Sequence, residues 1–238
     1  MGKKLEGVLI NLFVESENFN IFYKSLLFPK YMKTRFIPAN SKEKLNKNYF
    51  LESSKSLPKK IALVYSIQYE PIAKEVKFIL EKTHEVVKFS QVLGCSKVSF
   101  PKQTQAVLLI GSGKFHAISL ATSSSLPIYM YEQSKLTKLS EKEILSFNQR
   151  KKTAYIKFLS SDKIGVLVST KPGQQNLIKA LELKKRLKQK KLYFFLGDFL
   201  SAGEFENFGL NSWINTACPR LDMDSTSIIN ISNLEKLS

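Results

Sequence analysis

Cysteine is scarce in this 238-residue sequence, which contains only Cys95 and Cys218. Two cysteines so far apart in the chain do not form the disulfide framework of a small secreted protein. The sequence also lacks any apolar run approaching the roughly 20 residues that are needed to span a bilayer. A short apolar segment near its start is followed by Glu15 and Glu17, without the small-residue cleavage site of a signal peptide. We therefore expect a cytoplasmic protein that does not span a membrane.

Arginine is scarce as well, although the formal net charge is +17. Only four of the 37 basic residues are arginines, namely Arg35, Arg150, Arg186 and Arg220. Arginine is the side chain favoured for bidentate contacts to phosphate and guanine, whereas the lysines here are spread along the chain. We expect no dedicated nucleic-acid site. The charge fits either a compositional bias or a diffuse affinity for an acidic or RNA-bound partner.

The chain has only two histidines, His84 and His116. They cannot form a zinc site by themselves, because the companion ligands and their spacing are missing. His84 is expected to be structural, and a lone histidine such as His116 is more often a structural hydrogen-bonding group than a catalyst. No Ser-His-Asp or Cys-His arrangement can be drawn from spacing alone.

What the sequence does contain is a regular alternation of short apolar runs and amphipathic segments from residue 60 onward. Apolar runs rich in β-branched and aromatic residues predict strands buried on both faces, at 60–66, 85–90, 106–110, 127–131, 163–170 and 192–199. Segments with helical periodicity predict crossover helices at 69–84, 117–125 and 175–191, and the polar stretch 132–152 predicts a connecting helix. This order predicts an α/β protein built on parallel sheets.

Three loops follow the predicted strands, namely "GSGKFH" (111–116), "STKPGQ" (169–174) and "GDFLSAGE" (197–204). Ligands of parallel sheets gather at the carboxyl ends of strands. "GSGKFH" matches neither a Walker A loop nor a dinucleotide fingerprint. It is either a tight turn that needs glycine or a loop whose amides approach an anion. "STKPGQ" is either a turn before a helix or a set of polar groups for a carboxylate or an amine.

The segment "WINTACPRLDMDS", which holds Cys218, has two interpretations on chemistry alone. The cysteine is either a buried thiol in a turn, as is common in cores, or a ligand of a redox centre whose other ligands lie elsewhere.

Five segments taken together resemble a known family in order and spacing: "QVLGCSK", "LLIGSGKFHAISLA", "PIYMYE", "STKPGQ" and "WINTACPRLDMD". The family is that of diphthamide biosynthesis, with the archaeal-type 2-(3-amino-3-carboxypropyl)histidine synthases. The resemblance runs from about residue 58 to the end, and more faintly from residue 6.

The resemblance implies three similar α/β domains, each giving one cysteine to a [4Fe–4S] cluster that leaves one iron open to S-adenosylmethionine. It further implies transfer of a 3-amino-3-carboxypropyl group to a histidine of translation elongation factor 2. Residues 58–133 would be the second domain, with Cys95 as ligand, and residues 134–238 the third, with Cys218. Residues 1–57 would be a remnant of the first domain, so that two complete domains accompany it.

The resemblance also implies that the loops at strand ends bind S-adenosylmethionine. Gly111 and Gly113 would allow close backbone approach, with His116 beside them, and Lys171 or Gln174 would meet the amino-acid end of the cofactor.

The first-domain cysteine of the family has no counterpart in this sequence. A homodimer or a heteromer with a chain that supplies the missing cysteine is therefore expected. The alternatives are a fragment or decayed copy of such a synthase, a non-catalytic scaffold or binding subunit of the same system, and a basic RNA-associated module that keeps only the fold.

Overall fold

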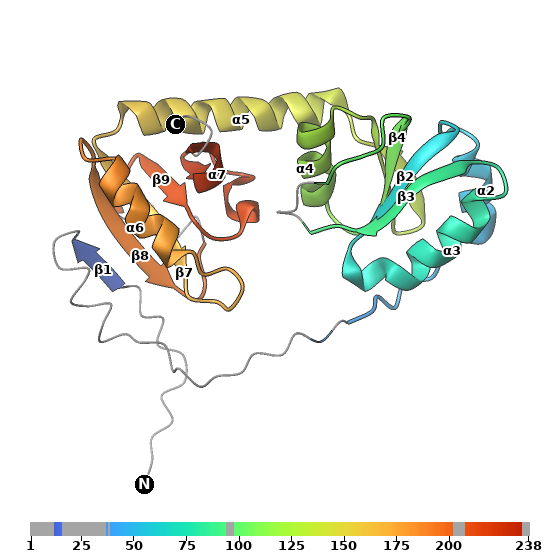
Figure 1. The fold of residues 1–238 in the computed structure, drawn as a ribbon, viewed down its shortest axis with the longest axis horizontal. Helices are drawn as coiled ribbons and strands as arrows, with labels where there is room; N and C mark the ends of the chain where they lie inside the picture. The colour runs from blue at the N-terminus through green and yellow to red at the C-terminus, as the bar shows by residue number, and fades with distance from the viewer. Residues whose placement is uncertain (1–11, 16–36, 38, 94–97, 202–207, 235–238) are drawn as a thin grey trace, which may run out of the picture. The chain divides into compact units, whose positions relative to one another are not determined.

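The computed structural model describes residues 12–15, 37, 39–93, 98–201 and 208–234. The chain divides into two compact units. Residues 36–147 form the central unit, and residues 148–238 together with 1–35 form the C-terminal unit. In the described part of the chain, each unit contains one five-stranded sheet (Figure 1).

The sheet of the central unit has the strand order β3-β2-β4-β5-β6. Strands β2 to β5 pair in parallel, and β6 is antiparallel to β5. The strands are β2 (Lys60–Tyr65), β3 (Glu85–Gln91), β4 (Ala106–Ile110), β5 (Ile128–Glu132) and β6 (Lys135–Lys138). β4 is buried along its whole length, which explains why its sequence is a continuous apolar run and not an alternation.

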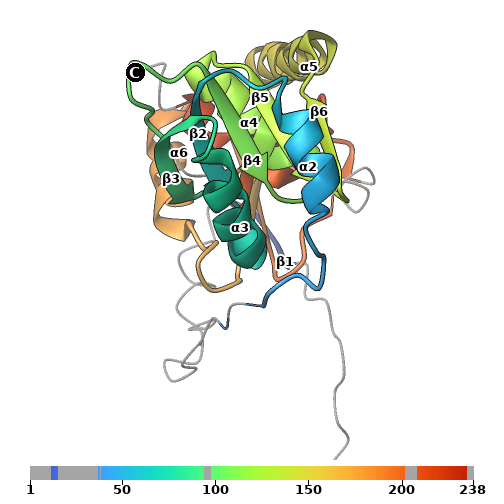
Figure 2. The same ribbon diagram turned by 90° about the vertical axis from the view of Figure 1, so that its right-hand side faces the viewer.

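Helices cover both faces of this sheet. They are α2 (Lys47–Ser54), the short 3-10 helix η1 (Ile67–Tyr69), α3 (Glu70–Leu80) and α4 (Lys114–Ser124). α3 has Pro71 in its first turn and buries Ile72, Ala73, Val76 and Leu80, which recur at helical spacing. α2 and α3 lie in front of the strands in Figure 2, and α4 covers the opposite face.

The sheet of the C-terminal unit has the strand order β1-β8-β7-β9-β10. Its parallel strands are β7 (Lys163–Ser169), β8 (Lys191–Gly197), β9 (Ser212–Asn215) and β10 (Ile228–Asn230). β1 (Leu12–Glu15) pairs antiparallel with β8 at one edge. The helical elements are α6 (Leu177–Arg186), the 3-10 helix η4 (Pro219–Asp222) and α7 (Ile231–Leu234).

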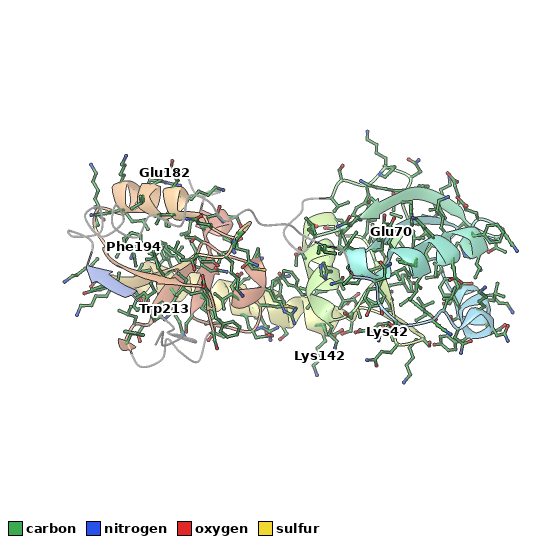
Figure 3. All side chains as sticks on the ribbon, turned by 90° about the horizontal axis from the view of Figure 1, so that it is seen from below. Lys42, Glu70, Lys142, Glu182, Phe194 and Trp213 are labelled. Carbon is green, nitrogen blue, oxygen red and sulfur yellow. The ribbon has the colours of Figure 1, made fainter. Side chains whose placement is uncertain are left out.

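The two faces of this sheet have different cores. One face packs Ile164, Val166, Phe194 and neighbouring residues against α6, α7 and Phe158. The other face is aromatic, with Tyr193, Phe195 and Trp213 in one cluster. The ring centres of Phe195 and Trp213 are 4.9 Å apart. Phe194 and Trp213, both labelled in Figure 3, therefore belong to opposite faces of one sheet.

The long helix α5 (Glu141–Ser160) has residues in both units. A capping box starts it, because the Ser140 backbone N–H donates to the Glu143 carboxylate at 3.0 Å and the Glu143 N–H donates to Ser140 Oγ at 3.3 Å. Glu143 also accepts from Lys114, and these bonds lower the pKa of Glu143 to about 2. Within the described residues, no helix combines the length and the apolar composition that a membrane crossing requires.

The predicted α/β class with parallel sheets is confirmed. The prediction of one helix over 132–152 is wrong at its start, where β5 and β6 form a hairpin, and the helix extends to Ser160. The hairpin turn consists of Gln133 and Ser134, with φ of 47° and 58°. Such a turn normally carries Asn or Gly, so the sequence contained no usual signal for it. The division into domains 1–57, 58–133 and 134–238 stays a prediction, and the compact units have different boundaries.

We predict that Gly165→Ala destabilises the C-terminal unit. A Cβ at Gly165 would lie 2.0 Å from a ring carbon of Trp213, which is its cross-strand neighbour on β9. Overpacking of this kind costs about 1–3 kcal/mol of the free energy of unfolding, which chemical denaturation measures. In a Trp213→Leu background the same substitution should cost clearly less, because the two sites contact each other. An equal cost in both backgrounds would contradict this explanation.

Candidate functional site

The carboxyl ends of β7, β8 and β9 meet at one edge of the C-terminal sheet. The register pairs Ser169 of β7 with Gly197 of β8, and Leu167 of β7 with Asn215 of β9. The loops that begin at Thr170, Asp198 and Thr216 therefore leave the sheet from the same edge, where parallel sheets bind ligands. The predicted residues Lys171 and Gln174 lie in the first of these loops, and Cys218 lies in the third.

Cys218 is a free, half-buried cysteine directly before η4. Its backbone is extended, with φ −64° and ψ 128°, and Pro219 begins the short helix. The carbonyl oxygen of Cys218 accepts two hydrogen bonds, from Asn215 Nδ2 at 2.8 Å and from the Leu221 N–H at 3.1 Å. The backbone that carries the thiol is thus fixed on both sides.

Asn215 is fully buried and uses its whole side-chain amide in this loop. Its Nδ2 donates to Asp222 Oδ1 at 2.8 Å as well as to Cys218, and its Oδ1 accepts from the Ala217 N–H at 2.8 Å. Asn230 Nδ2 donates to the same Asp222 oxygen at 3.2 Å. The buried ends of β9 and β10 are therefore both linked, through the Asp222 carboxylate, to the turn that follows Cys218.

Burial raises the pKa of Asp222 above the ordinary value of 3.8. The hydrogen bonds from Asn215 and Asn230 and the positive charge of Lys151 act in the opposite direction. Because the folded state holds this proton more tightly than the unfolded state, the free energy of unfolding falls as the pH rises from about 3.8 through the raised pKa.

The loop between β7 and α6 is also held by specific contacts. Thr170 donates its hydroxyl to the Asp198 carboxylate. The Lys171 ammonium lies 5.3 Å from the centre of the Phe199 ring, and the Gln174 N–H donates to the Lys171 carbonyl at 3.1 Å. Gly173 has φ +79°, a conformation that favours glycine. The loop thus forms the predicted turn and also presents polar groups at the sheet edge.

One hydrogen bond connects this loop to the loop of Cys218. Asn176, the residue before α6, donates from Nδ2 to the Thr216 carbonyl at 2.7 Å. Thr216 is itself anchored, because its N–H and its hydroxyl both donate to the Leu167 carbonyl. The structure therefore brings the segment with Lys171 and Gln174 next to the segment with Cys218.

The "GSGKFH" loop lies in the central unit, after β4. Gly113 has φ +76°, a conformation that favours glycine, so this turn requires glycine as one of the two interpretations expected. Its N–H donates to the Glu132 carboxylate at 2.8 Å, so a carboxylate of the protein already uses one amide that an anion would use. A Cβ at Gly111 would lie 3.0 Å from Ser66 Oγ. His116 is half-buried on α4, with its ring centre 5.4 Å from that of Phe115.

Cys95 lies in residues 94–97, outside the described residues. The expectation that Cys95 and Cys218 serve one cluster, and so lie close together, therefore stays a prediction, as does the expectation that the "GSGKFH" and "STKPGQ" loops bind the same cofactor. Within the ranges that the structure describes, no group of three or more His, Cys, Asp or Glu side chains could hold a metal ion. Cys218 fits the role of a single thiolate ligand, because it is half-buried, lies on an edge loop and has a fixed backbone.

Sequence reasoning missed the residues that fix the Cys218 loop, namely Asn176, Asn215, Asp222 and Asn230. A signal existed for two of them. Asn215 and Asn230 each directly follow a short apolar run in the sequence, where burial is expected, and a buried amide needs hydrogen-bond partners nearby. Both residues are buried in the structure.

Comparison with known proteins decides the family. Residues 24–228 match the family described as diphthamide synthesis proteins. The chain belongs to this family. The resemblance that the five sequence segments indicated is thereby confirmed.

This member of the diphthamide synthesis family has curated relatives. Two of them are archaeal proteins named 2-(3-amino-3-carboxypropyl)histidine synthase. The protein from Methanocaldococcus jannaschii is 30% identical over 207 residues, which are 81% of this chain and 57% of that protein. The protein from Pyrococcus horikoshii is 27% identical over 213 residues, which are 82% of this chain and 61% of that protein. The chain thus spans about three fifths of the length of these relatives.

Solved structures agree with the fold. The crystal structure of Dph2 from Pyrococcus horikoshii with a 4Fe-4S cluster matches with a TM-score of 0.68 at 24% identity, over 87% of this chain and 67% of that chain. A second structure of the same protein has a TM-score of 0.70 at 23% identity and covers 85% of this chain and 64% of that chain. The predicted diphthamide-synthase type of α/β fold is therefore confirmed.

We predict that Asp222→Ala lowers the free energy of unfolding more than Asp222→Asn does. Alanine leaves the buried amides of Asn215 and Asn230 without their acceptor, at about 1–3 kcal/mol, whereas asparagine keeps an oxygen there. Denaturation at several pH values should also show that Asp222→Asn gains stability relative to the unchanged protein as the pH rises above 3.8, because its side chain does not ionise. Equal losses for both variants at every pH would show that the carboxylate has no such role.

Proposed function

We propose that the chain is a 2-(3-amino-3-carboxypropyl)histidine synthase or a subunit of one. It would catalyse the first step of diphthamide synthesis, transferring the 3-amino-3-carboxypropyl group of S-adenosylmethionine to a histidine of translation elongation factor 2. Membership of the family supports this proposal. The observation that carries it is the position of half-buried Cys218 at the carboxyl-terminal edge of a parallel sheet, where the Asn215 amide holds its backbone carbonyl.

Cys218 would hold a [4Fe–4S] cluster together with Cys95. When bound, this cluster would supply the electron that cleaves S-adenosylmethionine to give the aminocarboxypropyl group in reactive form. The hydrogen bonds to the Cys218 carbonyl fix the backbone from which the thiol projects, so that little backbone rearrangement would be needed when the metal binds. The last residues of β7 and β9, Ser169 and Asn215, are buried, so the sheet end from which the loops leave is shielded from water.

Lys171 and Gln174 would meet the amino-acid end of S-adenosylmethionine. The Lys171 ammonium lies over the Phe199 ring, which limits its conformations while leaving N–H donors for a carboxylate. Thr170 and Asp198 hold the start of the same loop. In the central unit, Gly111, Gly113 and His116 would contribute to the same cofactor site.

A third thiolate would come from a second polypeptide, either another copy of this chain in a homodimer or, in a heteromer, a chain that carries the missing cysteine. The family scheme uses three cysteines, and this sequence contains two. The presence of only two of the three cysteines also favours one alternative, a non-catalytic subunit that binds elongation factor 2 and supports the cluster of a partner.

We predict that Cys218→Ala abolishes stable cluster binding. The test is anaerobic reconstitution with iron and sulfide in the presence of dithiothreitol, which can supply the missing thiolate. The readouts are protein-bound iron and sulfide, and then transfer of labelled aminocarboxypropyl group to elongation factor 2. Cys95→Ala should have the same effect, whereas Ser225→Ala, a matched control beyond η4, should bind iron normally.

The outcomes separate the two candidate functions. Iron binding that depends on Cys218, followed by transfer to elongation factor 2, supports the synthase. Binding of elongation factor 2 without transfer under any of these conditions supports the non-catalytic subunit. Iron binding that is unchanged in Cys218→Ala would contradict both the ligand role and the proposed site.

A further inference from the structure

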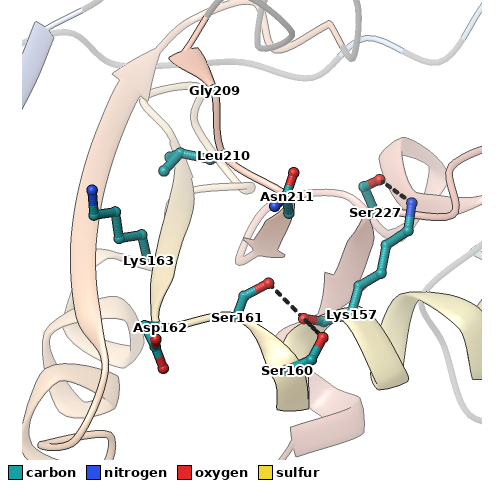
Figure 4. Close-up of a pocket in the computed structure, with 9 residues that line it drawn as sticks. All are labelled: Lys157, Ser160, Ser161, Asp162, Lys163, Gly209, Leu210, Asn211 and Ser227. Carbon is teal, nitrogen blue, oxygen red and sulfur yellow. Dashed lines mark hydrogen bonds between the residues drawn. The ribbon is translucent and has the colours of Figure 1, made fainter.

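A pocket of about 580 Å³ opens at the edge of the C-terminal sheet where the parallel strands begin (Figure 4). It lies between the end of α5, the start of β7 and the residues just before β9 and β10. Its lining residues are Lys157, Ser160, Ser161, Asp162, Lys163, Gly209, Leu210, Asn211 and Ser227. Most of these side chains are polar, and two are lysines.

This pocket is separate from the Cys218 loop. It contains the first residue of β7, Lys163, whereas the loops of Lys171 and Cys218 follow the carboxyl ends of β7 and β9. A seven-residue strand spans about 20 Å, so roughly that distance separates the two edges of the sheet. A ligand in this pocket would not overlap with the site described above.

The charges in the pocket favour an anion. Lys157 Nζ donates to two neutral oxygens, Ser227 Oγ at 3.0 Å and Thr226 Oγ1 at 3.4 Å, which orient it without neutralising it. The ion pairs found among the described residues include neither Lys157 nor Lys163. Among the lining residues the only carboxylate is Asp162. The two lysines thus leave an excess of positive charge.

The end of α5 would normally disfavour an anion, because the last carbonyls of a helix carry partial negative charge. Here Lys190 Nζ donates to the Leu159 carbonyl at 3.0 Å and to the Ser161 carbonyl at 2.8 Å. The hydroxyls of Ser160 and Ser161 also donate to the Lys157 carbonyl, at 3.2 and 2.6 Å (Figure 4). These bonds offset the repulsion that the helix end would otherwise exert.

We propose that this pocket binds a small phosphorylated metabolite with hydroxyl groups, such as a sugar phosphate. Lys157, which Ser227 and Thr226 orient, binds the phosphate, and Asn211, Ser160 and Ser227 offer donors and acceptors to the hydroxyls. The Lys163 ammonium points to the other side of the pocket in Figure 4, so it adds positive charge without contacting the same phosphate. The volume lies in the usual range for small-ligand pockets. A concave site of limited size with two lysines suits a compact phosphate monoester better than an extended nucleic-acid backbone, which a longer basic groove would bind.

Isothermal titration calorimetry of the whole 238-residue chain tests this inference, with ribose 5-phosphate as ligand and ribose as the uncharged control. Lys157→Met and Lys163→Met remove the charge but keep most of the aliphatic stem. Lys157→Met should weaken ribose 5-phosphate binding by about tenfold or more, because a charge-assisted hydrogen bond is lost, and Lys163→Met should weaken it less, because only a nearby charge is lost. Lys185→Met, on the exposed side of α6, is the matched control and should leave the affinity unchanged. Circular dichroism verifies that each variant is folded.

Saturable binding of ribose 5-phosphate that depends on Lys157 and, less strongly, on Lys163 but not on Lys185 supports the proposal. Absence of heat and of thermal stabilisation with millimolar ribose 5-phosphate would overturn it. Equal weakening by Lys185→Met would show general surface electrostatics and would also overturn it. So would a result in which a single-stranded RNA oligonucleotide binds through the same lysines while ribose 5-phosphate does not bind.

Discussion

The amide of Asn215 is the contact on which the candidate site depends. One Nδ2 hydrogen binds the carbonyl of Cys218, the other binds the carboxylate of Asp222, and the Oδ1 accepts from Ala217. Since Asn215 is fully buried at the end of β9, these bonds are shielded from competition by water. The position of the Cys218 backbone is therefore set by the sheet itself and not by the loop alone. A thiolate that has to bind a metal in one orientation benefits from such a rigid attachment.

The parallel sheet explains why residues distant in sequence share one edge. β7 lies between β8 and β9, so the loops that follow these three strands emerge side by side. The hydrogen bond from Asn176 to Thr216 then joins the Lys171 loop to the Cys218 loop. Behind this edge, Gly165 leaves room for Trp213, which lets an aromatic core form on one face of the sheet. The polar edge and the dense core are thus two consequences of one strand order.

Much of the fold could be predicted from sequence because its signals are local. The run at 60–66 and the run at 106–110 are strands in the structure, and the helical spacing after Pro71 gives α3. The strand β9, which ends three residues before Cys218, was not among the strands predicted from the sequence. The hairpin at Gln133 and Ser134 was not predicted either, since neither residue normally marks such a turn.

Contacts between residues that lie far apart in the sequence could not be predicted, and the reason is physical. The pairing of β1 with β8 joins segments near opposite ends of the chain, and no local pattern encodes its register. The contacts of Asn215, Asp222 and Asn230 depend on where the turn after Cys218 places its side chains. The lysine pocket likewise forms only when the end of α5 and the starts of three strands come together.

The most direct test of the central claim, that Cys218 is a ligand of an iron–sulfur cluster, is Mössbauer spectroscopy of the reconstituted protein with 57Fe. Cys218→Ser replaces the sulfur ligand with oxygen and keeps a side chain of similar size. The account predicts that the signal of one iron site changes its isomer shift and quadrupole splitting while the other sites keep theirs. A spectrum identical to that of the unchanged protein, at equal iron content, would contradict it.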